Sequence, residues 1–221
     1  MKWLTQWLPG LPHSDAAQTT ALPPEIAAQI KAWHALPTPD FNTPHFESHY
    51  TVINTETTSL DMADSRLLAV AAITIQSRHI TPAASYYTPL TPSPAQTLAD
   101  LLTFCGKTPL VIFSDINRTT LTQAIHKTLG LDIASMPLLW LDLYTLLPSL
   151  FPDRIERSSY LKDWMNTFDM ETFLRHHALG DAWIIAQLFL AAQGKARIRG
   201  INTPLALAEL EHQRHRLMRQ L

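Results

Sequence analysis

The residues with the clearest capacity for chemistry lie at the start of an apolar segment near position 180. His176 precedes Asp181 by five residues, and Asp181 leads into the apolar run Trp183–Leu190. Five residues make about 1.4 turns of a helix, so the two side chains can face one site. A carboxylate that holds a cation, beside an imidazole that takes a proton from water, is suited to metal-assisted hydrolysis. A capped, solvated helix start would contain the same residue types.

A second polar pair follows a segment with the composition of a β-strand. Tyr50–Ile53 is aromatic and β-branched, and an acidic, hydroxyl-rich stretch comes directly after it. Asn54 and Glu56 are two residues apart, so they project from the same face of an extended chain. Two oxygen donors at this spacing, at the end of a strand, are suited to a hard divalent cation.

Both segments carry a family resemblance. Residues Asn54–Leu60 resemble Asp-x-Glu-Thr-Thr-Gly-Leu, the first motif of the DnaQ-like (DEDDh) 3′-to-5′ exonucleases, and His176–Asp181 matches their last motif, His-x-Ala-x-x-Asp. The resemblance runs from about Phe46 to Gln193, with the motifs in the family's order. It implies an α/β, ribonuclease-H-like three-layer fold, in which helices flank a central mixed β-sheet.

The resemblance also implies a role for individual residues. The expected activity is two-metal phosphodiester hydrolysis at the 3′ end of single-stranded DNA or RNA, with Mg²⁺ or Mn²⁺ as the cofactor. His176 would be the general base, and the neighbouring His177 is the alternative, although that motif position is variable. The implied metal ligands are Asn54, Glu56, Asn117 and Asp181, and the implied nucleotide contacts are Thr57, Thr58 and Leu60.

Two of the implied metal ligands are amides where the family has aspartates. Asn54 begins the first motif, and Asn117, aligned through Leu121, takes the aspartate position of the middle motif. Two divalent cations about 4 Å apart repel each other and need several carboxylates to hold them. An amide offers only one neutral carbonyl oxygen. The sequence therefore predicts weakened catalysis with one bound ion or none, unless Asp115 acts as a compensating ligand on an extended backbone.

Each amide also has a purely structural interpretation. Asn117 would be a good N-cap for the helix that follows it, and Asn54 could satisfy loop backbone at a strand end. Two functions therefore stay open: an exonuclease with weakened catalysis, and a degenerate homologue that binds nucleic acid or a partner protein without turnover. The fold cannot decide between them, because function depends on the site.

The chain divides into three predicted regions. Residues 1–46 form a proline-rich N-terminal arm with one helix at 24–35, residues 47–195 form the exonuclease-like domain, and residues 196–221 form a C-terminal helical extension. The arm and the extension are the candidate docking sites for a protein partner.

Within the domain, periodicity and turn residues predict the order of the elements. A hairpin of two strands comes first after the motif strand, and strands and helices then alternate, which fits an α/β core. The expected strands are 67–75, 79–87, 109–113 and 138–141, and the expected helices are 95–105, 118–129, 143–150 and one that opens at 181.

The composition is that of an intracellular soluble protein. The 221 residues are 46% hydrophobic with a formal charge of −2, and the single cysteine, Cys105, excludes an internal disulfide. No segment has the roughly 18 apolar residues of a membrane span, and the first residues lack the apolar run of a signal peptide. We therefore expect a cytoplasmic protein with no membrane association.

Overall fold

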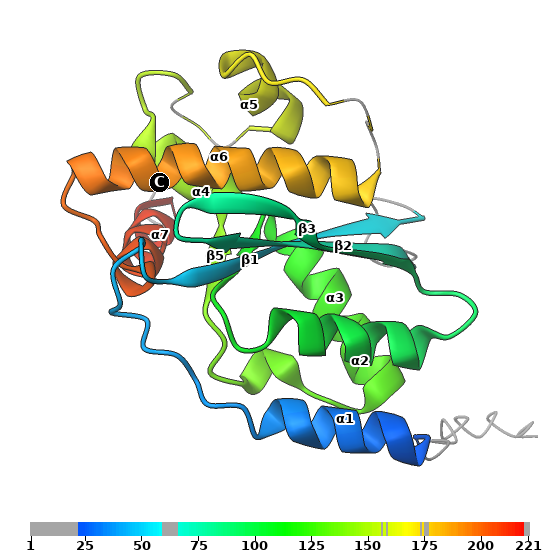
Figure 1. The fold of residues 1–221 in the computed structure, drawn as a ribbon. Helices are drawn as coiled ribbons and strands as arrows, with labels where there is room; N and C mark the ends of the chain where they lie inside the picture. Colours follow the sequence, from blue (N-terminus) through cyan, green and yellow to red (C-terminus); the bar gives the residue numbers. More distant parts are fainter. Residues whose placement is uncertain are drawn as a thin grey trace, which may run out of the picture.

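The computed structural model describes most of the chain. The described residues are 22–58, 66–155, 157, 159–172, 174 and 177–218. They form one five-stranded mixed sheet, in the order β3-β2-β1-β4-β5, with helices on both faces (Figure 1).

Three strands form an antiparallel meander, and two short strands extend it in parallel. The first three are β1 (His49–Thr57), β2 (Leu67–Gln76) and β3 (His79–Pro89), and the parallel strands are β4 (Leu110–Ile112) and β5 (Trp140–Asp142). The predicted hairpin is present, with Ser77 and Arg78 at its turn.

Helices cover the two faces as separate layers (Figure 1). One face carries α1 (Pro24–His34), α2 (Pro94–Cys105) and α3 (Asp115–Leu129), with a 3₁₀ turn at Ile133–Ser135. The opposite face carries α4 (Leu143–Leu150), α5 (Leu161–Thr167), α6 (Ala178–Ile198) and α7 (Pro204–Met218). The ribonuclease-H-like three-layer α/β fold predicted from the sequence is confirmed.

Alternation along the central strands explains why both faces are covered. In β2, Ala71 and Ile73 pack beneath α6 in one core, while Val70 and Ala72 pack against α2 and α3 in the other. Successive side chains of a strand point to opposite faces, so a strand that is apolar at every position must be buried on both.

Capping residues move two helix starts relative to the sequence prediction. The Ser114 side chain accepts the Ile116 N–H, so α3 begins at Asp115 instead of residue 118. His177 caps α6 in the same way, and that helix begins at Ala178 instead of 181. The sequence analysis did not predict α5, a short helix that buries Trp164.

The two flanking regions pack onto the domain. Helix α1 contacts α2, and the Trp33 indole N–H donates to the Gly106 carbonyl over 2.8 Å. Helix α7 contributes Leu207 and Ala208 to the same core as α6. The boundaries at 46 and 195 stay predictions. Within the described residues, no helix combines the length and apolar character needed to cross a bilayer.

Candidate active site

The predicted site residues belong to elements that meet at one edge of the sheet. Strands β1, β4 and β5 are parallel, so their carboxyl ends share that edge. Three segments meet at this edge: the end of β1, which contains Glu56, the start of α3, which contains Asn117, and the first turn of α6, which contains Asp181.

The start of α6 contacts two polar side chains of β1. The Ala178 N–H donates to Glu56 Oε1 over 2.5 Å, and Asn54 Nδ2 donates to the Ala178 carbonyl over 3.3 Å. Asn54 and Glu56 therefore share a face, as their spacing predicts. A carboxylate at a helix N-terminus is stabilised by the free N–H groups and by the helix dipole.

The two amides of the site are bonded to each other. Asn117 Nδ2 donates to Asn54 Oδ1 over 2.6 Å, in a partly buried position. Asn54 thus accepts from Asn117 and donates to Ala178. The interpretation of Asn117 as the helix cap is wrong, because Ser114 has that role and Asn117 is the third residue of α3.

Asp181 lies in the same helical turn as these contacts. It is three residues after Ala178, a spacing that puts two residues on the same side of a helix. Its backbone N–H donates to the His177 carbonyl over 3.0 Å and so closes the first turn of α6. Its role as a metal ligand stays a prediction.

Of the two candidate bases, only His177 lies within the described residues; His176 is outside them, as is Leu60. His177 Nδ1 accepts the Leu179 N–H over 3.3 Å, which makes this imidazole the cap of α6. Its ring centroid lies 4.3 Å from that of Tyr87 on β3.

The predicted nucleotide contacts follow Glu56 directly. Thr57 ends β1, and Thr58 exchanges backbone and side-chain hydrogen bonds with Arg66. The Thr58 hydroxyl oxygen accepts the Arg66 N–H over 3.0 Å. A contact of Thr57 or Thr58 with a nucleotide remains a prediction.

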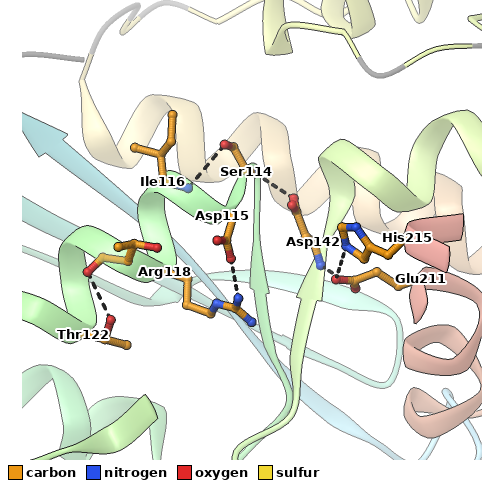
Figure 2. A network of polar contacts seen from close by, with 9 residues as sticks. Ser114, Asp115, Ile116, Arg118, Thr122, Asp142, Glu211 and His215 are labelled. Carbon is orange, nitrogen blue, oxygen red and sulfur yellow. Dashed lines mark hydrogen bonds and ion pairs between the residues drawn. The ribbon is translucent and has the colours of Figure 1, made fainter. Parts of the chain in front are cut away.

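Asp115 belongs to a different group of side chains. Its carboxylate pairs with Arg118 over 2.6 Å, and both side chains are exposed (Figure 2). With about 100° of rotation per helical residue, Asp115 and Arg118 lie about 60° apart, whereas Asn117 lies about 160° from Asp115. Asp115 therefore lies on the side of α3 away from the amide pair, which does not favour its proposed compensating role.

Two of the four predicted metal ligands at the motif site are amides, which weakens the fit to a two-metal centre. Asn54 and Asn117 hold each other's polar atoms, and Glu56 already accepts a helix N–H. Two neutral amides supply too little negative charge for two divalent cations. Within the described part of the chain, no group of three His, Cys, Asp or Glu side chains is placed to hold a metal ion.

A second polar network at this edge was not predicted from the sequence. Asp142 Oδ1 accepts the Ser114 N–H over 2.7 Å, and Glu211 Oε2 accepts the Asp142 N–H over 2.9 Å (Figure 2). Asp142 Oδ1 also accepts the Tyr144 N–H over 2.9 Å. Burial, with the charge of Asp142 nearby, raises the pKa of Glu211 to about 7. Burial also raises the pKa of Asp142. Glu211 lies beyond the resembling segment, so no motif indicated it.

The fold places the chain in the class of ribonuclease-H-like α/β domains, and similar solved structures are nucleases. No family model and no curated protein matches the sequence. Cell-death related nuclease 4 (CRN-4) has a TM-score of 0.51 and 15% identity, with 67% of this chain and 64% of that chain covered. The nuclease domain of 3′hExo, a DEDDh family member bound to rAMP, has a TM-score of 0.52 and 10% identity, with 69% and 94% covered.

E. coli exonuclease I, in a zinc-bound complex with single-stranded DNA, has a TM-score of 0.54 and 14% identity, with 67% of this chain and 41% of that chain covered. The chain thus spans less than two thirds of CRN-4 and less than half of exonuclease I. At these identities, the likeness establishes a shared fold.

Proposed function

We propose that this chain is a DnaQ-like exonuclease-family protein that binds the 3′ end of single-stranded nucleic acid and hydrolyses it weakly or not at all. The observation that carries the proposal is the 2.6 Å contact between Asn117 and Asn54, at the two positions where the family has aspartates. Because each amide satisfies the other, the pair needs no cation, whereas two carboxylates at this separation would repel each other without one.

The geometry of the motif site supports binding of nucleic acid even where hydrolysis is weak. Glu56 and the first turn of α6 keep the relative placement that the motifs imply, joined by the bond from the Ala178 N–H. Beside them, Tyr87 is 36% exposed and its ring packs against the imidazole of His177. An exposed aromatic ring can stack on a base, which contributes about 1–3 kcal/mol per base. In line with this, E. coli exonuclease I is known in complex with a dT13 oligonucleotide.

The protein's own side chains at the motif site can position a nucleotide. Glu56 is held by the N-terminus of α6, and its second carboxylate oxygen can accept from a nucleotide hydroxyl. Divalent ions, when bound in such sites, supply the charge that activates water and stabilises the leaving oxyanion. Without two of the family's carboxylates, we expect binding to survive and the hydrolytic rate to fall most.

The test measures binding and cleavage on the same samples. Fluorescent single-stranded DNA and RNA with a free or a phosphorylated 3′ end are titrated with protein, and cleavage is followed in Mg²⁺ or Mn²⁺. The proteins are the wild type, Asn54→Asp/Asn117→Asp, and a charge-matched control, Asn42→Asp/Asn166→Asp, at two exposed positions. We expect the wild type to bind free 3′ ends without appreciable cleavage, and only the motif variant to gain hydrolysis.

Two results would contradict the proposal. Efficient cleavage by the wild type would show that the amides support catalysis. Absence of any single-strand binding by the wild type would remove the nucleic-acid role and leave a scaffold for a protein partner.

A further inference from the structure

A cleft among the described residues lies beside the motif site and is separate from it. It has a volume of about 600 Å³ and opens between α3 and α7, over the end of the edge strand β5. This volume falls within the range of about 300–1,000 Å³ that is typical of small-molecule sites. Neither Asn54 nor Asn117 lines this cleft, so the cleft does not share the amide pair.

Cationic side chains reach the cleft from two helices. Arg118 comes from α3, while His212 and Arg216 come from α7, where they are four residues apart and share one side of the helix. Arg118 pairs with the exposed Asp115, and an exposed pair of this kind contributes about 0–1 kcal/mol. Its guanidinium can therefore turn to an anionic ligand at little cost.

The carboxylates of the cleft are already engaged in holding the fold. Asp142 accepts two backbone N–H groups, and Glu211 accepts the Asp142 N–H and lies 3.7 Å from His215 Nε2 (Figure 2). Burial raises the pKa of Glu211 to about 7, so near neutral pH this group is partly protonated. Asp142 and Glu211 each use a carboxylate oxygen on backbone N–H groups, whereas Arg118 has only an exposed ion pair with Asp115 and Arg216 is exposed, so the basic groups are the more available to an anionic ligand.

An indole forms part of the same wall. Trp140, in β5, is half-buried and lines the cleft together with Ile112. A partly exposed indole offers a flat apolar surface to a ring, and arginine binds phosphate in bidentate geometry. A ligand that uses both features has a planar ring at one end and a phosphate at the other.

We propose that this cleft binds a nucleoside monophosphate, with its phosphate between Arg118 and the His212–Arg216 side of α7 and its base against Trp140. The proposal is independent of the function proposed for the motif site. Asp142 and Glu211 would accept from sugar hydroxyls or an exocyclic amino group.

Binding of such a ligand is linked to protons. Glu211 faces Asp142 from β5, Asp115 and Arg118 from α3, and its own helix neighbours His212, His215 and Arg216. A negatively charged phosphate nearby favours the neutral form of Glu211. Affinity should therefore be higher at about pH 6 than at about pH 8.

The experiment is calorimetric titration of the full chain with AMP, adenosine and inorganic phosphate at both pH values. The variants are Arg118→Gln/Arg216→Gln, the matched control Arg154→Gln at an exposed loop position, and Glu56→Gln in the motif site. We expect AMP to bind more tightly than phosphate or adenosine and more tightly at the lower pH. The double arginine variant should weaken AMP binding by at least about tenfold, Arg154→Gln should leave it unchanged, and Glu56→Gln reports separately on any binding in the motif site.

Three outcomes would overturn the proposal. The first is no binding of AMP at either pH, and the second is binding of inorganic phosphate as tight as that of AMP, which would show that the base is not recognised. AMP binding that is lost in Glu56→Gln and kept in the arginine variant would place the nucleotide in the motif site instead. Melting temperatures of all variants, measured in parallel, separate loss of binding from loss of fold.

Discussion

Two clusters of polar side chains flank the first turn of α3, and they differ in how their charge is balanced. On one side, Asn117 and Asn54 are neutral amides that satisfy each other over 2.6 Å. On the other side, Asp142 and Glu211 are carboxylates whose pKa values are raised by burial. The amide cluster is neutral and hydrogen-bonded without a cation or an added proton, whereas the charge of the carboxylate cluster depends on pH.

The comparison shows that two polar clusters at one edge of a sheet can be balanced in different ways. Exchanging carboxylate for amide at residues 54 and 117 keeps oxygen and hydrogen-bond geometry but removes the charge that would retain metal ions. The two carboxylates that lie close together, Glu211 on α7 and Asp142 at the end of β5, are outside the motif site.

The largest effect is expected at the helix start that holds the amide cluster together. A Cβ on Gly180 would overlap the Leu174 carbonyl oxygen and lie 2.9 Å from Leu174 Cβ. Gly180→Ala should therefore reduce the free energy of unfolding by about 3 kcal/mol, the upper end of overpacking effects. The matched control is Gly194→Ala on the same helix, where no atom lies within 4 Å. It should stabilise by about 0.5–1 kcal/mol in the same urea titration.

The carboxylate cluster predicts a pH-dependent effect of nearly the same size. The pKa of Glu211 is raised from 4.5 to about 7 in the folded state, so the fold binds this proton more tightly than the unfolded chain does. This contribution is fully present below about pH 4.5 and is lost as the pH rises through about 7. Glu211→Gln should therefore match the wild type near pH 4.5 and exceed its stability by about 2–3 kcal/mol near pH 8.

Thermal unfolding across this pH range checks the sign. Glu209→Gln, at an exposed position of the same helix, is the control and should follow the wild type at every pH. A constant difference between Glu211→Gln and the wild type would show that Glu211 does not titrate differently in the two states.

For the amide cluster, we expect that introducing negative charge lowers stability unless a divalent ion is added. In Asn54→Asp/Asn117→Asp, two carboxylates replace a hydrogen-bonded pair and one of them faces the Ala178 carbonyl. We expect a loss of about 2 kcal/mol without divalent ions, and recovery on addition of Mg²⁺ or Mn²⁺. Melting temperature with and without metal measures this, and Asn42→Asp/Asn166→Asp should show neither change.

The smallest effect tests the junction that separates the two clusters. Ser114 has φ 87° and ψ 138°, a conformation that strains any residue with a Cβ, while its hydroxyl caps α3. Ser114→Gly removes the strain and loses only a few tenths of a kcal/mol of capping, so we expect a net gain of about 1 kcal/mol. Ser114→Ala keeps the strain and loses the cap, and should destabilise by about 1 kcal/mol. Equal effects of both substitutions would contradict the assigned strain.

The sequence was sufficient to predict the strands and helices that have a strong local pattern. Two strand-like segments joined by a short turn predicted β2 and β3, and the motif spacing predicted that Asn54 and Glu56 share a face. Helix starts were displaced by three residues, because the caps Ser114 and His177 are recognised by their backbone geometry and not by their residue type alone. The contact between Asn117 and Asn54 joins residues 63 positions apart, so only the fold could reveal it.

The α3–α7 cleft could not have been predicted for a related reason. In the sequence, Glu211 is one of several charged residues on an amphipathic helix. Its pKa is raised only when α7 packs this side chain against the end of β5. Burial and neighbouring charge are tertiary properties that a single sequence does not display.

The central claim is that the amide pair at 54 and 117 has replaced a metal-holding carboxylate pair. Mn²⁺ binding, followed by electron paramagnetic resonance on the wild type, Asn54→Asp/Asn117→Asp and the same variant with Glu56→Gln, tests it most directly. The account predicts no ordered Mn²⁺ in the wild type, tight binding in the Asp variant, and loss of that binding when Glu56 is also changed. Two Mn²⁺ ions bound by the wild type as tightly as by the Asp variant would contradict it.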